Sequence, residues 1–230
     1  YDRMVQSGLT PTTATNTQLA GYADHTFEYD DQFRVTLENT NAFGSYGFSY
    51  TTNPNGLSST DFNHWNAKTV ETLPDGNENI VYTNFQKQAM LSVFHDVSAS
   101  AQWITYSQFN DKGYVTLKAL PSALSGYDDD YNDLVAWSFG NATYIKDGEG
   151  LILTNTYGSS TTATSTTAGD AAGWLASSAL RRGETGTDVP QQELDYLQRT
   201  VGGMLDAARA TDYAALGGIY AQTDLLEGEA

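Results

Sequence analysis

Oxygen-bearing side chains alternate along residues 127–134, "YDDDYNDL". Asp128, Asp130 and Asn132 have the spacing found at the start of a calcium-binding loop. Such a loop places Gly at its sixth position and a bidentate Glu at its twelfth, where this sequence has Asp133 and Phe139. A solvated turn would use the same side chains. We therefore expect no cofactor, with calcium at Asp128, Asp130 and Asn132 as the alternative.

Groups that could perform catalysis are scattered. A pair of the 28 acidic residues could act as in a glycosidase, but sequence spacing does not show which carboxylates approach one another. His25, His64 and His95 do not have the spacing of a metal site, and the chain has no G-x-S-x-G, P-loop or G-x-G-x-x-G motif. The sequence predicts a non-catalytic protein, and a glycosidase-like enzyme is the less favoured alternative.

Charge and composition limit the partners. Eleven basic against 28 acidic residues give a net charge of −17, which repels nucleic acid and anionic membrane surfaces. No apolar run is long enough to span a bilayer, so we expect no membrane insertion. The absence of cysteine excludes disulfides and thiolate metal sites. Since the chain opens with Tyr1 and not Met, we expect a processed product or a piece of a longer protein.

The elements that position these residues are predicted to be strands. Fifteen Tyr, nine Phe and four Trp favour strands, and 21 Gly with many Asn and Asp interrupt them. Turn signals recur at 53–56, 74–77, 111–113 and 147–150, with short alternating segments such as 102–106 and 115–119 between them. This spacing predicts antiparallel hairpins and an all-β fold with almost no helix in residues 1–155.

The last third of the chain has a different composition. The Ser/Thr/Gly-rich tract 158–173 is predicted to be a loop or a flat polar strand edge. The apolar spacing of residues 190–201 suits a helix or a strand equally, and that of 204–216 favours a helix. We therefore divide the chain into a hairpin array at 1–157, a loop at 158–173, and continuing strands or a small helical segment at 174–230.

One short unit recurs. Residues 29–37, "YDDQFRVTL", match 109–117, "FNDKGYVTL", without a gap; 145–153 keeps part of the pattern, and 85–93 keeps only its ends. In this unit a stacking side chain ends a strand, an Asp forms the turn by accepting backbone N–H groups, and an apolar strand returns. The predicted stacking positions are Tyr29, Phe109 and Ile145, the turn formers are Asp31, Asp111, Asp147 and Gly113, and the returning apolar positions are Val35, Val115 and Leu151.

The unit resembles the YD repeat of the Rhs and teneurin proteins, which runs Tyr-Asp, two spacers, Gly, Arg and an apolar residue. Tyr29-Asp30 and Arg34-Val35 match it, with Phe33 in the Gly position; Gly113 and Val115 match a second copy that begins Phe109-Asn110. The resemblance covers about residues 20–160, and 71–91 and 119–134 resemble connecting segments of such proteins. It implies a continuous β-sheet ribbon that forms an extracellular or cell-surface shell or fibre, used for scaffolding, encapsulation or adhesion. It also favours strand for 190–201.

The resemblance implies partners of two kinds: further repeats of the same parent chain, or copies of the chain joined through sheet edges. The self-cleavage motif of some family shells needs Asp-Pro, which this sequence lacks; Asn53 precedes its only Pro-x-Gly-Leu. The alternative from another class is a β-sandwich or propeller-type adhesin that binds glycans through aromatic side chains. The candidates for that role are Trp65, Trp103, Trp137 and Trp174.

Overall fold

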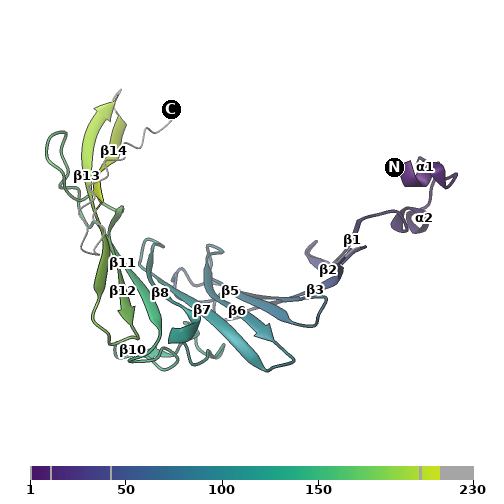
Figure 1. Cartoon of the computed structure of the whole chain (residues 1–230), viewed down its shortest axis with the longest axis horizontal. Helices are drawn as coiled ribbons and strands as arrows, with labels where there is room; N and C mark the ends of the chain where they lie inside the picture. The colour runs from purple at the N-terminus through teal and green to yellow at the C-terminus, as the bar shows by residue number, and fades with distance from the viewer. Residues whose placement is uncertain (1, 11, 42, 202–203, 213–230) are drawn as a thin grey trace.

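The computed structural model describes residues 2–10, 12–41, 43–201 and 204–212. Twelve strands form one antiparallel sheet in the order β1-β2-β3-β4-β5-β6-β7-β8-β11-β12-β13-β14, which curves along an arc with β1 and β14 at opposite ends (Figure 1). The all-β prediction is confirmed. The strands are β1 (His25–Tyr29), β2 (Val35–Thr40), β3 (Gly44–Thr52), β4 (Ala67–Thr72), β5 (Glu78–Thr83), β6 (Ala89–Asp96), β7 (Ala101–Phe109), β8 (Val115–Ala119), β11 (Leu151–Tyr157), β12 (Leu175–Arg182), β13 (Val189–Val201) and β14 (Met204–Asp212).

The remaining elements are short. Two five-residue helices, α1 (Asp2–Gln6) and α2 (Asn16–Ala20), precede the sheet. A 3₁₀ turn at Pro121–Ala123 and a two-stranded pair, β9 (Trp137–Ser138) and β10 (Asn141–Ala142), lie between β8 and β11. None of the helices in the described part of the chain is long and apolar enough to cross a membrane.

The C-terminal part of the sheet corrects one prediction. Residues 190–201 lie in β13, the strand that the resemblance favoured. The helix predicted for 204–216 is wrong for 204–212, which form β14; residues 213–216 lie outside the described residues. The Ala-rich sequence of β14 has helical propensity, but its backbone pairs along the length of β13 from Leu194 to Val201. Pairing with β13 therefore overrides the helical propensity of the β14 sequence.

The core lies on the central strands. A row of directly paired residues crosses five of them, and each of its members is at most 1% exposed. The row runs Tyr82, Leu91, Tyr106, Ala119 and Ile152, on β5, β6, β7, β8 and β11. Because each residue faces the next across the ladder, one buried row ties five strands together.

Two long connections complete this core. The β3–β4 connection (53–66) contributes Trp65, and the β8–β11 connection (120–150) contributes Leu134 and Val135. The two connections bind each other: the backbone N–H of Trp65 donates to the carbonyl of Asn132 at 2.9 Å, and its indole N–H donates to the carbonyl of Asp129 at 3.2 Å. Connections far apart in the sequence thus close over the same strands.

Candidate functional site: a row of turns along one end of the sheet

Five connections at the same end of the sheet share one backbone hydrogen bond. Because consecutive strands run up and down, alternate connections lie at the same end of the sheet. In each, the residue after one strand donates its N–H to the carbonyl of the residue before the next strand, at 2.9–3.0 Å. The donor and acceptor residues are Asp30 and Arg34, Asn53 and Asn66, Asn84 and Gln88, Asn110 and Tyr114, and Gly158 and Trp174. We call these five connections the turn row.

Asp or Asn begins four of the five turns. Its side-chain oxygen accepts the backbone N–H two residues later, at 2.9–3.0 Å, in the Asx-turn arrangement. In the three short turns the same oxygen also accepts the N–H four residues later, at 2.9–3.1 Å. These polar side chains therefore replace the backbone partners that the turn residues lack. The four residues are Asp30, Asn53, Asn84 and Asn110.

In four of the five turns, the residue before the one whose carbonyl accepts the shared bond has a left-handed backbone conformation. Its φ is +60° at Phe33, +64° at Lys87, and +79° at both Gly113 and Gly173. Gly113 is required for a second reason, because a Cβ there would lie 2.5 Å from the ring of Phe62. Phe33 and Lys87 hold this conformation although a side chain disfavours it. The fourth residue of each short turn is therefore left-handed, and Phe33 occupies this position in the first turn.

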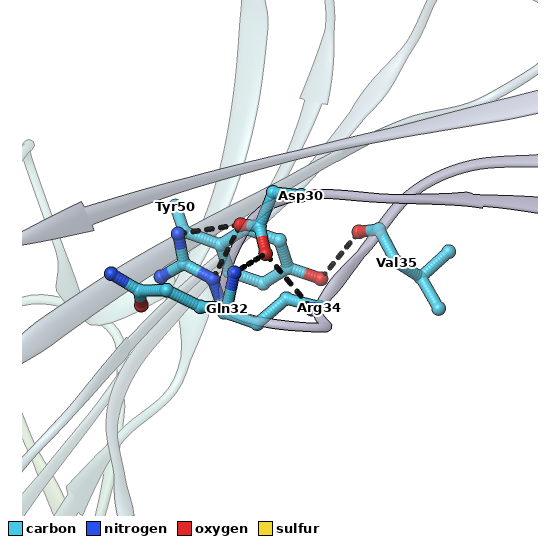
Figure 2. Close-up of polar contacts among 5 residues, drawn as sticks. All are labelled: Asp30, Gln32, Arg34, Val35 and Tyr50. Carbon is cyan, nitrogen blue, oxygen red and sulfur yellow. Dashed lines mark hydrogen bonds and ion pairs between the residues drawn. The ribbon is translucent and has the colours of Figure 1, made fainter.

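The first turn carries an additional ionic contact (Figure 2). The carboxylate of Asp30 accepts from both Nε and a terminal nitrogen of Arg34, each at 2.7 Å. The backbone N–H of Arg34, and then its guanidinium, hold the pKa of Asp30 below its usual value. The guanidinium also lies over the ring of Tyr50, 4.4 Å from the centroid. Asp30 thus organises both the backbone and the side chains of this turn.

A tyrosine from the neighbouring strand closes three of the turns. The hydroxyl of Tyr50 donates to the carbonyl of Val35 at 2.7 Å while its ring lies against Arg34, the preceding residue. In the second case Tyr157 donates to Val115 at 2.9 Å and stacks on Tyr114 at 4.9 Å; in the third Tyr196 donates to Leu175 at 2.7 Å and packs on Trp174 at 5.3 Å. We call these the tyrosine contacts. Each binds a turn to the next strand of the sheet.

Two of the five connections are enlarged versions of the short turn. The 158–174 connection keeps the bond from Gly158 to Trp174, and Gly173 donates to the carbonyl of Gly158 at 2.7 Å, as Gly113 donates to that of Asn110 at 3.0 Å. In the short turn two residues separate these partners, whereas here residues 159–172 do. The loop predicted at 158–173 is therefore an insertion into this turn. The 53–66 connection is enlarged at a different place: Gly56 donates to the carbonyl of Asn53 at 3.0 Å, so the extra residues follow Gly56.

Neighbouring turns also bind each other. The side-chain amide of Gln88 donates to the carbonyl of Gly113 at 3.0 Å. Asn63, from the enlarged 53–66 connection, donates to the carbonyl of Phe109 at 2.8 Å and accepts its N–H at 2.7 Å. Asn84 donates to the carbonyl of Phe62 at 3.0 Å. The middle of the turn row is thus one hydrogen-bonded band across β3 to β8.

The structure shifts the predicted turn formers by one residue. Asp31 and Asp111 lie inside the turns, but the side chains that accept the turn N–H groups are Asp30 and Asn110. The Tyr-Asp pair and its Phe-Asn counterpart carried this signal, because the Asx residue directly follows the last strand residue. Gly113 has the positive φ expected of a turn glycine.

The predicted stacking and apolar positions lie in different environments. Tyr29 ends β1 and is 58% exposed, whereas Phe109 is buried at the end of β7 and belongs to the core. Val35 and Val115 begin β2 and β8, directly paired with these two residues. The register therefore matches the predicted unit, although the two aromatic side chains do not share one environment.

Two of the aligned segments do not begin where the sequence placed them. The turn at 84–88 follows Thr83, two residues before the segment that begins at 85. Ile145 is buried and bridges Leu124, and the carbonyl of Asp147 accepts the N–H of Thr185 at 3.0 Å. Residues 145–150 thus belong to the long β8–β11 connection at the other end of the sheet, and only Leu151 begins a strand. Asp147 is not a turn former of this unit.

The calcium candidates lie in a loop rich in internal hydrogen bonds. Asp128 accepts the N–H of Asp130 at 2.9 Å and the hydroxyl of Tyr144 at 3.4 Å. The backbone carbonyl of Asn132 accepts from Trp65. Across the described residues, no three His, Cys, Asp or Glu side chains are grouped so as to hold a metal ion.

The glycan candidates are spread over the molecule. Trp65 is buried and Trp137 packs against the core, whereas Trp103 and Trp174 are 49% and 42% exposed. Trp103 lies beside Phe94 on β6, with ring centroids 5.7 Å apart.

Comparison with known proteins assigns no family. No family model matches the chain, and no curated protein matches it.

Proposed function

We propose that this chain is a structural, non-catalytic wall segment of an extracellular or cell-surface shell or fibre, built from YD-repeat-like hairpins. Its task would be to continue a curved β-sheet that scaffolds, encapsulates or adheres. The observation that carries the proposal is the turn row. One backbone bond recurs in five turns along one end of an open sheet, four of these turns begin with an Asx cap, and insertions in two of them leave the bond in place.

Two further features support a wall. The Asx residue directly follows a strand, and the left-handed position comes three residues later, the offset at which the YD pattern has Asp and Gly. Contacts in the sheet are mostly between neighbouring strands, so each hairpin is stabilised by the next, as in repeat proteins. Such a sheet can grow by adding hairpins without changing those already present.

Imaging the intact parent protein by cryo-electron microscopy tests the proposal. A wall segment predicts that the sheet seen here continues beyond β14 into further antiparallel strands of the same ribbon. A parent in which this sheet ends at β14 and stands as a separate domain would overturn the proposal.

A glycan-binding surface is the second candidate, because Trp103 and Phe94 form an exposed aromatic pair. Its distinguishing readout is a glycan array with the purified chain and its Trp103→Ala variant. Binding to a defined sugar that the variant loses would favour this function over a purely structural one.

A further inference from the structure

Strand β1 is an unpaired edge with an aromatic surface. β1 ends the strand order, and the described residues before it, 2–10 and 12–24, form α1 and α2 and no strand. His25, Phe27 and Tyr29 share one face of the strand, with successive ring centroids 6.3 and 6.4 Å apart. Phe27 is 46% exposed and Tyr29 is 58% exposed. Of the features that commonly protect an edge, this short strand has one charged residue, Glu28, and a register irregularity, but no Lys or Pro.

The same three residues direct their backbone groups outward. The carbonyl of Asp24 accepts from Asn41, and the N–H of Asp30 donates to Arg34, so the even-numbered residues at both ends face β2. Backbone groups alternate along a strand, and the register irregularity between β1 and β2 adds its extra residue to β2. The N–H and carbonyl groups of His25, Phe27 and Tyr29 therefore point to the free edge.

The sequence of β1 is compatible with pairing to itself. In an antiparallel pair centred on Phe27, Phe27 faces Phe27 of the second copy and His25 faces Tyr29. On the other face Glu28 lies opposite Thr26, so the two carboxylates do not meet. Each outward-facing pair can exchange two backbone hydrogen bonds. Within β1 no like charges face each other when a two-fold axis passes through residue 27. Just beyond its ends Asp24 lies opposite Asp30 of the second copy, and the carboxylate of Asp30 is already bound to Arg34.

We propose that β1 pairs antiparallel with β1 of a second copy, which joins two sheets through a two-fold axis at Phe27. The inference rests on the proposed wall in one respect: β1 is taken as an end of the ribbon. The β1 pairing and the proposed wall function can fail separately. A chain that stays monomeric in solution would rule out this joint between two β1 strands, but it would not affect whether the sheet continues beyond β14 in the parent protein. Since each copy carries a charge of −17, added salt should strengthen the pairing by screening repulsion between the copies.

Cysteine cross-linking of the full chain tests the joint, because the chain has no cysteine of its own. Hydrogen-bonded antiparallel partners have Cα atoms about 5.5 Å apart, a separation that a short bismaleimide cross-linker spans. Phe27→Cys should therefore give a covalent dimer when it is treated with such a cross-linker. Phe43→Cys, at another exposed Phe outside β1, should remain monomeric. Equal cross-linking of both variants would overturn the proposal.

A charge exchange provides a test without cysteine. Phe27→Lys and Phe27→Glu should each abolish dimers in sedimentation velocity, since like charges then face each other across the axis. An equimolar mixture of the two should restore them, and circular dichroism checks that both variants fold. A wild-type chain that is monomeric from micromolar to hundreds of micromolar, or dimers that weaken as salt rises, would contradict the joint.

Discussion

At the scale of single residues, the turn row shows where the chain tolerates backbone strain. Phe33 holds a φ of +60° while 88% of it is exposed, so its side chain gains little from packing. The left-handed conformation costs a side-chain-bearing residue roughly 1–2 kcal/mol relative to a conformation that suits it, whereas Gly adopts it freely. The free-energy cost at Phe33 therefore comes from its backbone conformation, and packing of the side chain does little to offset it.

Replacing Phe33 by Gly should stabilise the protein. We expect Phe33→Gly to raise the free energy of unfolding by about 1 kcal/mol, and the midpoint of thermal unfolding by roughly 2–4 °C. Urea denaturation followed by circular dichroism measures the first quantity. Gly76→Ala is the matched control: Gly76 has φ +85° and an added Cβ would meet no atom within 4 Å, so it should lose about as much. A Phe33→Gly variant less stable than the wild type would contradict the argument.

The residue scale is also where the sequence is most informative. An Asx turn needs only residues that are close in sequence, so Tyr29-Asp30 and Phe109-Asn110 can be found from their spacing. The sequence comparison places the capping residue one position late because Asp31 and Asp111 are identical in the two segments, whereas Asp30 and Asn110 differ. To locate the capping residue, it is more useful to align side chains that can accept the same hydrogen bonds, such as Asp30 and Asn110, than to align identical residues.

At the scale of elements, the tyrosine contacts connect each turn to a strand that follows later. The spacing from carbonyl to tyrosine is 15 residues for Tyr50, 42 for Tyr157 and 21 for Tyr196. No fixed sequence period describes these separations. The contacts become equivalent only once the register of each strand pair is known, which is why they cannot be predicted from the sequence. The same dependence on pairing explains why the local sequence of β14 favours a helix that does not form.

Removing the hydroxyl should weaken each contact independently. Tyr50→Phe and Tyr157→Phe should each lower the free energy of unfolding by about 1 kcal/mol, the net contribution of one such hydrogen bond. Because the two contacts join different strand pairs, the losses should add in the double variant. Tyr131→Phe is the control, since Tyr131 is 48% exposed and its ring takes no part in a tyrosine contact. Equal losses in all three single variants would show that the contacts have no special role.

At the scale of the whole molecule, insertions of two kinds enlarge the turns. The 53–66 insertion contributes Trp65 to the main core and packs Phe62 against Gly113. The 158–174 insertion buries Ala163 and Ala171 against Leu194 and Tyr196, in a small cluster separate from the main core. Sequence composition identifies the second as a loop but does not show that the first is a core element, because the burial of Trp65 depends on strands and a connection that come later in the chain.

Shortening each insertion should therefore have unequal effects. When 159–172 is replaced by Asp-Lys, as in the turn at 110–114, the chain should keep its β-sheet spectrum and unfold cooperatively, because the closing bonds at Gly158 and Gly173 need no other loop residue. Stability should fall moderately, since Gly169 no longer exchanges backbone bonds with Tyr196. The same replacement of 54–64 removes Phe62 and the two bonds between Asn63 and Phe109, and so should cost several kcal/mol. Circular dichroism with urea denaturation compares the two. If losing 159–172 unfolded the chain while losing 54–64 did not, the turn row would not be the framework into which the loops are inserted.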